Sequence, residues 1–361
     1  MGIGRNGYYT LKDILKEKAT YNWIISDRND GKSFAVKKRA LERSIKAQKP
    51  LFALIRRNEV DIKPSKVERY FVDRNINLIS EITKGEYDHV KCRSNYIYLA
   101  GYDENGREKR SPYAIGEYYA LSTALHEKST GHICEIIIAE EMLTDGQYLD
   151  NEPSEFMHLV STLCRSDSAE VYMIGNTINR ICPYFKEWGM KNIFKQESGT
   201  IDTYWYKQLD GTLIKICCER VKPRENKKSN LFIGKAEKSI QGGEWQTQEF
   251  PKLWKKFEDF DLIDSITYIS PYGVIYTIAL IIDDNGSKFC FVYPAKHISE
   301  RVLTSEFSEN PLHTPRLKKD RRIDISIHNC YIQNKFLYSD NLTGTDFTNS
   351  IKAEKLNPFL G

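Results

Sequence analysis

The sequence predicts an α/β fold whose first half is built on a parallel sheet. Four short runs are largely apolar rather than alternating, at residues 21–25, 51–55, 136–138 and 171–174. Strands of this kind are covered on both faces, which is typical of parallel sheets. Helical patterns lie between them, the clearest at residues 33–47, and this alternation indicates an α/β domain.

A change in composition near Arg220 divides the chain. The 361 residues are enough for about two domains. Residues 221–230 are polar and charged, so we interpret 221–260 as a linker between a first domain (1–220) and a second domain (261–361).

The elements expected after residue 250 are one helix and several strands. Residues 251–260 predict a short amphipathic helix. Residues 274–282 and 288–293, joined by a turn at 284–286, predict a β-hairpin, and 323–327 predict another strand. In the first domain, the alternating segments of 70–100 predict an antiparallel insertion.

Composition narrows the class of protein. Hydrophobic residues make up 40% and charged residues 28% of the chain, which excludes a disordered tail and a membrane-embedded protein. The longest apolar run, 274–282, is shorter than the roughly 20 residues of a membrane-spanning helix. The N-terminus lacks a signal-peptide core and the eight cysteines form no C-x-x-C pair, so we expect a reduced, cytoplasmic chain without structural zinc. The net charge of +4 is too near balance to predict a nucleic-acid partner.

The most informative segment, S-D-R-N-D-G-K-S, follows an apolar strand and opens a helix. It nearly matches the phosphate-binding motif G-x-x-x-x-G-K-[ST], with Ser26 where the first glycine belongs. In such a loop, Lys32 reaches the β and γ phosphates and the Ser33 hydroxyl binds Mg²⁺. The predicted site for ATP and Mg²⁺ consists of Ser26, Asp27, Arg28, Asn29, Asp30, Gly31, Lys32 and Ser33. The alternative is an ordinary strand–turn–helix with a solvated lysine.

A second strand ends in two acidic residues. Residues 136–138 lead through Ala139 into Glu140 and Glu141. We expect Glu140 to hold the metal and Glu141 to polarise the attacking water. A register shifted by one residue would put Ala139 at the metal position and Glu140 at the base position, which predicts weak hydrolysis. A strand with a solvated acidic end is the third interpretation.

These motifs and their surroundings resemble the DNA-encapsidation ATPases of phi-29-like phages, which are short relatives of the large viral terminases. The resemblance is carried by residues 23–33, Leu54-Ile55-Arg56-Arg57, Leu121-Ser122, Glu127-Lys128-Ser129, residues 151–165, Gly175-Asn176 and Pro183-Tyr184-Phe185. Weaker matches follow at residues 230–234 and at Asp340-Asn341. Residues 20–190 are covered well and the rest of the chain thinly.

The resemblance implies a fold and a set of partners. The fold is a parallel-sheet ASCE (additional-strand) P-loop ATPase domain followed by a smaller α+β, RNase H-like domain that is a vestigial nuclease. The assembly is a homo-oligomeric ring, expected to be a pentamer, that uses ATP to drive double-stranded DNA into a preformed capsid. It acts in the host cytoplasm, at the portal vertex, with the portal (connector) protein and a packaging RNA as partners. Because the family does not cut DNA, we expect no nuclease activity from the acids Asp283, Asp284, Asp340 and Asp346.

The resemblance also assigns individual roles. Arg165 corresponds to an arginine finger acting in trans on the neighbouring subunit's γ-phosphate; the alternative is a surface arginine. Asn176 follows the apolar run 171–174, at a strand end where a polar side chain can contact the attacking water or the γ-phosphate; the alternative is a turn residue. Lys128 would sense the nucleotide or contact the next subunit; the alternative is a solvated lysine.

Two basic clusters are candidates for nucleic-acid contact. One consists of Arg107, Lys109 and Arg110, on a predicted loop, and the other of Arg316, Lys318, Lys319, Arg321 and Arg322. Phosphate contacts are independent of base sequence, which suits a motor that must move any DNA. Either cluster could instead be a solvated face.

Three functions are therefore open at this point. They are a DNA translocase, a helicase-like P-loop ATPase, and an inactive nucleotide fold that scaffolds DNA or RNA. The departures from the usual motifs at Ser26 and Glu140 keep the inactive scaffold open.

Overall fold

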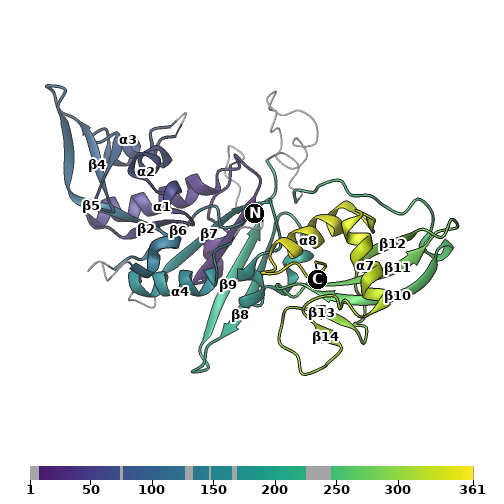
Figure 1. Cartoon of the computed structure of the whole chain (residues 1–361). Coiled ribbons are helices and arrows are strands. Elements are labelled where there is room, and N and C mark those ends of the chain that lie inside the picture. The colour runs from purple at the N-terminus through teal and green to yellow at the C-terminus, as the bar shows by residue number, and fades with distance from the viewer. Residues whose placement is uncertain are drawn as a thin grey trace. The chain divides into compact units, whose positions relative to one another are not determined.

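The computed structural model describes residues 8–73, 76–126, 133–145, 148–164, 169–224 and 245–360 (Figure 1). Its internal contacts divide the chain into two compact units. The first comprises Met1–Leu143, Leu149–Ile178 and Glu187–Glu244, and the second comprises Thr144–Tyr148, Asn179–Lys186 and Trp245–Gly361.

A nine-stranded sheet of order β3-β4-β5-β2-β6-β7-β1-β9-β8 organises the first unit. Its strands are β1 (Tyr21–Ser26), β2 (Phe52–Arg56), β3 (His89–Arg93), β4 (Tyr96–Tyr102), β5 (Glu108–Ala120), β6 (Ile136–Ala139), β7 (Glu170–Asn176), β8 (Thr200–Lys207) and β9 (Leu213–Arg220). The six inner strands from β5 to β9 run parallel to one another, and β3, β4 and β8 extend the sheet as antiparallel strands. The four largely apolar runs all form inner parallel strands, as predicted.

Helices of the first unit pack around this sheet. They are α1 (Lys32–Ala47), α2 (Pro64–Tyr70), α3 (Leu78–Thr83) and α4 (Glu152–Leu163), with 3₁₀ turns η1 (Ile14–Glu17), η2 (Glu59–Asp61), η3 (Leu121–His126) and η4 (Lys191–Phe194). The short helix α5 (Pro183–Glu187) follows β7. The predicted antiparallel insertion is confirmed at β3 and β4, whereas residues 64–70 and 78–83 are helical.

Parallel pairing brings the ends of several strands to one edge of the sheet. Ser26, the last residue of β1, pairs with Asn176 at the end of β7, and Ala139 at the end of β6 pairs with Met173. Residues that follow these strands are therefore neighbours, although they are far apart in the sequence. Ligands of open α/β sheets bind at this carboxyl edge.

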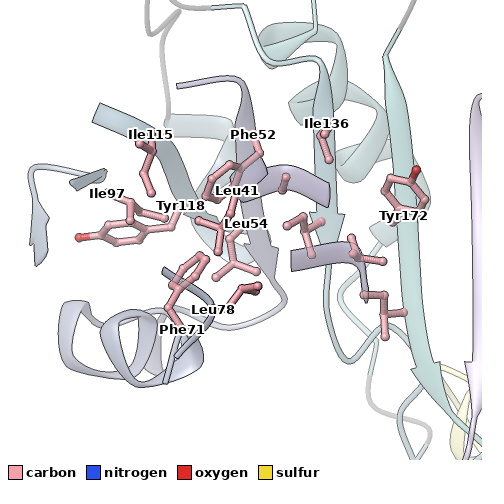
Figure 2. Packing of buried hydrophobic residues seen from close by; sticks show 14 of the residues in the cluster. Leu41, Phe52, Leu54, Phe71, Leu78, Ile97, Ile115, Tyr118, Ile136 and Tyr172 are labelled. Carbon is pink, nitrogen blue, oxygen red and sulfur yellow. The ribbon is translucent and has the colours of Figure 1, made fainter. Parts of the chain in front are cut away.

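The core of the first unit fixes these strands. Figure 2 shows Leu41 of α1 with Phe52 and Leu54 of β2 and Ile136 of β6, and all four are fully buried. Gly116 of β5 lies directly against the Phe52 ring, where an added Cβ would be 2.4 Å from Cζ of that ring. A larger residue at position 116 would displace the Phe52 ring, and with it the strand that leads to the carboxyl edge.

The second unit has a six-stranded sheet of order β14-β13-β10-β11-β12-β15. Its elements are η5 (Phe257–Asp259), β10 (Asp261–Ile269), β11 (Ile275–Ile282), β12 (Lys288–Pro294), β13 (Val302–Thr304), β14 (His313–Thr314), α7 (Arg322–Ile332), β15 (Phe336–Tyr338) and α8 (Asn341–Lys352). The predicted hairpin is confirmed as the antiparallel pair β11–β12. The core of the second unit is centred on four fully buried aromatic residues: Tyr268, Tyr276, Phe347 and Phe359.

The strand predicted at residues 323–327 is wrong, because these residues open the helix α7. Ile323, Ile325 and Ile327 alternate with polar residues, which suits a strand, but Ile323 and Ile327 also lie one helical turn apart. With Cys330 they form a stripe that packs on the core of the second unit, and Ile325 is exposed.

The amphipathic helix predicted at residues 251–260 is also wrong. Only the 3₁₀ turn η5 forms there. The Tyr338 N–H of β15 donates to the Pro251 carbonyl (2.9 Å), and Leu253 and Phe257 pack on the apolar cluster of Ala279, Ile281, Phe291 and Leu337. Main-chain pairing and these contacts keep the segment non-helical.

Over the described ranges of the chain, no helix combines the length and the apolar character that crossing a bilayer requires.

Candidate nucleotide-binding site

A cavity of about 470 Å³ lies in the first unit, at the edge where β1, β2, β6 and β7 end. Residues of the predicted loop, of α1, of the strand ends and of the α2 region line it: Arg28, Asn29, Lys32, Ser33, Phe34, Lys37, Arg56, Tyr70, Asp73, Glu140, Glu141, Ile174, Gly175 and Asn176. The structure therefore brings the G-K-S segment, the acidic pair and the asparagine together around one space.

The loop between β1 and α1 has the backbone that its sequence requires. Gly31 is the N-cap of α1 and has φ 93°, a conformation that L side chains rarely adopt. An added Cβ at Gly31 would also lie 3.2 Å from Cδ1 of Tyr8. The Tyr9 N–H donates to the Asp30 carbonyl (2.8 Å), so the N-terminal segment supports the loop from outside.

The serine at the first-glycine position is accommodated by the strand. Ser26 is the buried last residue of β1, and its Oγ donates to the Asp27 carbonyl (2.9 Å). The Asp27 carboxylate accepts from Oγ1 of Thr177, which follows β7 (2.8 Å). Ser26 and Asp27 therefore join the loop to the neighbouring strand, whereas Arg28 and Asn29 face the cavity.

Lys32 points into the loop. Its Nζ donates to the Asn176 Oδ1 (2.7 Å), the Asp27 carbonyl (3.0 Å) and the Ser26 carbonyl (3.5 Å). These three acceptors are neutral, and phosphate oxygens form stronger, charge-assisted hydrogen bonds with an ammonium group. A triphosphate entering the cavity would therefore compete well for Lys32.

The two glutamates after β6 differ in their surroundings. Glu140 is buried, its N–H donates to the Ile55 carbonyl (3.0 Å), and its Oε1 accepts from the Tyr70 hydroxyl (2.8 Å). Glu141 has φ 59° and a side chain that is 61% exposed, 3.5 Å from Nη1 of Arg56. Ala139 is the last residue of β6 and is fully buried.

The two adjacent arginines at the end of β2, Arg56 and Arg57, have different partners. Arg57 forms a buried ion pair with Glu152 of α4 (Nε to Oε2, 2.7 Å) and donates to the carbonyls of Glu141 (3.1 Å) and Met142 (2.9 Å). Arg57 thereby holds the backbone after β6, while Arg56 lines the cavity.

Three polar residues of the cavity lining were missed at the sequence level: Lys37, Tyr70 and Asp73. The Lys37 Nζ donates to the Asp73 carboxylate (2.7 Å) and the Tyr70 carbonyl (3.0 Å). Burial lowers the pKa of Lys37, and its contact with Asp73 opposes this shift. Lys37 lies four residues after Ser33 on α1, so helical spacing could have revealed it; nothing in the sequence indicates Tyr70 or Asp73.

Other predicted site residues lie elsewhere. Lys128 and Arg165, and the weak match at residues 230–234, lie outside the described residues. Arg107 belongs to the β4–β5 turn, but Lys109 and Arg110 are in β5, so the predicted loop is shorter than expected. The second basic cluster precedes and opens α7 in the second unit, with Arg322 as the first helical residue: Arg316, Lys318, Lys319, Arg321 and Arg322.

The acids of the second unit have structural partners. Asp283 accepts from the N–H groups of Asn285 and Ser287 in the hairpin turn. Asp340 is the N-cap of α8, and Asp346 pairs with Arg180 (2.7 Å). In the described part of the chain, no three side chains of His, Cys, Asp or Glu are grouped as metal ligands.

The donors around the first-unit cavity fit Mg²⁺ and a triphosphate. The Ser33 hydroxyl and the Glu140 carboxylate offer the oxygen ligands that Mg²⁺ prefers, and Lys32 offers an ammonium group beside the start of α1. The chemistry of this donor set agrees with the predicted nucleotide and metal.

The strand order and the site define a class of protein. β7 lies between β1, which leads into the loop, and β6, which leads into the acidic pair. A parallel sheet with such an additional strand, and with G-K-S opening the helix after β1, is a P-loop ATPase fold. The chain matches the family model described as Podovirus DNA encapsidation protein (Gp16) over residues 3–197, and it belongs to this family.

Individual relatives agree with this assignment. A DNA packaging protein of Bacillus phage B103 is 27% identical over 182 residues, which are 49% of this chain and 50% of the phage B103 protein. The chain thus spans about half the length of the curated relative it matches.

Two solved structures share the fold over nearly the whole chain. The Phi-28 gp11 DNA packaging motor has a TM-score of 0.51 and 18% identity, covering 97% of this chain and 99% of that one. The bacteriophage Phi-29 viral genome packaging motor assembly has a TM-score of 0.54 and 19% identity, covering 95% and 99%. The predicted fold class, an ASCE P-loop ATPase domain followed by a smaller RNase H-like domain, is confirmed.

Proposed function

We propose that this chain is the ATP-hydrolysing subunit of a motor that moves double-stranded DNA into a preformed phage capsid. The observation that carries the proposal is the position of Lys32, whose Nζ donates to the Asn176 Oδ1 in the same cavity as Glu140 and Glu141. Membership of the DNA encapsidation family supports packaging as the use of that site.

In this proposal the cavity residues divide the work of phosphoryl transfer. Backbone N–H groups at the start of α1 and Lys32 bind the phosphates. Glu141, exposed to solvent at the cavity, orients the attacking water, and Asn176 takes up contact with the γ-phosphate or this water when Lys32 turns to the nucleotide. Ser33 and Glu140 would hold Mg²⁺, which would supply positive charge to neutralise the phosphate oxygens.

The proposed ring of identical subunits, with Arg165 acting in trans, is supported by the described residues on either side of the Arg165 segment. The carbonyl of Leu163 accepts from the Cys134 N–H (2.9 Å), just before β6, and Ala169 directly precedes β7. Both flanks of the Arg165 segment therefore lie at the amino edge of the sheet. β7 separates this edge from Asn176 by roughly 20 Å, at about 3.3 Å per residue. The distance of these flanking residues from their own cavity supports the proposal that Arg165 serves a neighbouring subunit.

The wider assembly is proposed from the family. The partners are double-stranded DNA, the portal protein, a packaging RNA and further copies of this chain, expected as a pentamer. The second unit is proposed to be a nucleic-acid-binding domain without nuclease activity, because its candidate acids form turn, cap and ion-pair contacts.

The proposal is tested by ATP hydrolysis with and without double-stranded DNA, in wild type and Lys32→Ala, beside a strand-separation assay. We expect DNA to stimulate wild-type hydrolysis without unwinding, and Lys32→Ala to lower hydrolysis by about 10²-fold or more, because it removes a donor to the transferring phosphate. Unwinding would identify a helicase-like enzyme, and ATP binding without any hydrolysis would identify a scaffold.

The β4–β5 turn is the proposed DNA contact of the first unit. Arg107 and Lys109 are exposed near this turn, whereas Arg110 pairs with Glu108 (3.0 Å). In a plot of the logarithm of the DNA-binding constant against the logarithm of salt concentration, each phosphate contact adds about 0.9 to the steepness of the slope. We therefore expect the slope to become less steep by about 2 in the double variant Arg107→Ala/Lys109→Ala. Lys38→Ala, an exposed lysine of α1, is the control. A wild-type affinity that does not change between low and high salt would remove this assignment.

A further inference from the structure

Tyr70 joins an insertion of the fold to the acidic strand of the site. It is the last residue of α2, which lies between β2 and β5 in the sequence. Its hydroxyl donates to Oε1 of Glu140 (2.8 Å). Its ring lies near two cations, the Lys37 Nζ at 5.3 Å and the Arg56 guanidinium at 5.8 Å from the ring centroid.

The position of Tyr70 is fixed from two sides. The Lys37 ammonium binds the Tyr70 carbonyl, so α1 holds the end of α2. On the other side, Glu68 of α2 accepts from the Cys92 N–H of β3 (3.1 Å). The tyrosine is therefore held by the helix that follows the phosphate loop and by the insertion that continues into the β4–β5 turn.

The chemistry of the contact is that of a fixed donor to a carboxylate. A phenol keeps its proton near neutral pH, so the Tyr70 hydroxyl is available to donate to the Glu140 carboxylate. Because Oε1 accepts this hydrogen bond, the second carboxylate oxygen of Glu140, Oε2, can serve as a metal ligand. Lys37 and Arg56, which lie near the Tyr70 ring, add positive charge to this side of the site.

We propose that Tyr70 is a positioning residue of the ATPase site, which holds the Glu140 carboxylate in the orientation that binds Mg²⁺ with the nucleotide. In this proposal Tyr70, which lines the cavity, acts through Glu140. This inference rests on the proposed ATPase function. Removal of such outer-shell partners lowers metal affinity or activity by about 10- to 100-fold in other metal sites.

Tyr70→Phe is the direct test, because it keeps the ring between Lys37 and Arg56 and removes only the hydroxyl. Tyr172→Phe is a matched control: the Tyr172 hydroxyl of β7 donates to Glu170 (2.7 Å), and neither residue lines the nucleotide cavity. Binding of ATPγS is measured by calorimetry over a Mg²⁺ titration, with a second series in EDTA.

We expect Tyr70→Phe to raise the half-saturating Mg²⁺ concentration by about 10-fold or more, with binding in EDTA and the melting temperature unchanged. Tyr172→Phe should match wild type in the Mg²⁺ titration. In a Glu140→Gln background, Tyr70→Phe should add little, because the group it orients has been altered.

Equal Mg²⁺ dependence in Tyr70→Phe and Tyr172→Phe would overturn the inference and leave the proposed ATPase function intact. A loss of EDTA-state binding or of thermal stability in Tyr70→Phe, without a shift in Mg²⁺ dependence, would also overturn it, since that is the result of a packing role. Wild-type protein that binds no ATPγS at any Mg²⁺ concentration would overturn the proposed function, and the inference with it.

Discussion

Glu141→Gln should bind ATP with Mg²⁺ and hydrolyse almost none of it, whereas Glu140→Gln should lose the Mg²⁺ dependence of binding. The reason is the difference in their surroundings. Glu140 is buried and accepts a hydrogen bond from Tyr70, while the Glu141 side chain is 61% exposed and its backbone has left the strand conformation, with φ 59°. General-base groups contribute about 10²- to 10⁴-fold to rate, so we expect a loss of that size in Glu141→Gln.

The same pair of variants decides the register of the acidic strand. In the shifted register, Glu140→Gln would trap bound ATP, and Glu141→Gln would still hydrolyse it. Equilibrium binding of ATP with and without Mg²⁺, measured beside single-turnover hydrolysis, separates the two patterns. Arg56→Ala is a useful companion variant, because Arg56 lies 3.5 Å from Glu141 and should affect hydrolysis without removing Mg²⁺ binding.

Arg165→Ala should lower hydrolysis by about 10³- to 10⁵-fold, the contribution of arginine fingers in other phosphoryl-transfer enzymes. Mixed with Lys32→Ala subunits, it should regain activity. In the mixed ring, an Arg165→Ala subunit keeps its own Lys32 and receives an arginine from a Lys32→Ala neighbour. With random mixing, about a quarter of the head-to-tail interfaces would be complete.

The control for this experiment mixes Lys32→Ala with Glu141→Gln. Both residues serve the cavity of their own subunit, so no interface of such a ring is complete and activity should stay low. If Arg165→Ala mixed with Lys32→Ala stays as inactive as this control, in rings confirmed to contain both subunits, the arginine does not act in trans.

Much of the fold could be predicted from the sequence because its signals are local. Continuous apolar runs such as Ile136–Ile138 can be satisfied only by strands covered on both faces. The glycine of the G-K-S segment was also a local signal. Gly31 adopts φ 93° at the start of α1, a backbone conformation that glycine adopts readily and other residues rarely do. The residues around Ile323 and Ile327 fit both the two-residue repeat of a strand and the helical repeat. Their packing on the core of the second unit, which the sequence does not show, decides for the helix.

The site was predictable only as far as its motifs reach. Lys32, Glu140 and Asn176 follow recognisable strands, and the structure brings them to one edge of the sheet. Tyr70 and Asp73 arrive through the insertion between β2 and β5, whose placement depends on tertiary contacts such as that of Glu68 with β3. Adjacent arginines cannot be separated by sequence, because the partner of Arg57 is almost a hundred positions away, in α4.

The central claim is that the loop from Ser26 to Ser33 binds the triphosphate of ATP, opposite Glu140 and Glu141. A structure of the protein determined with Mg²⁺ and ATPγS tests it most directly. We expect the Lys32 ammonium to leave Asn176 and bind the β and γ phosphates, with both glutamates facing them. A triphosphate bound elsewhere, or a loop in which Lys32 keeps its contacts with Asn176 and Asp27 at saturating nucleotide, would contradict the claim.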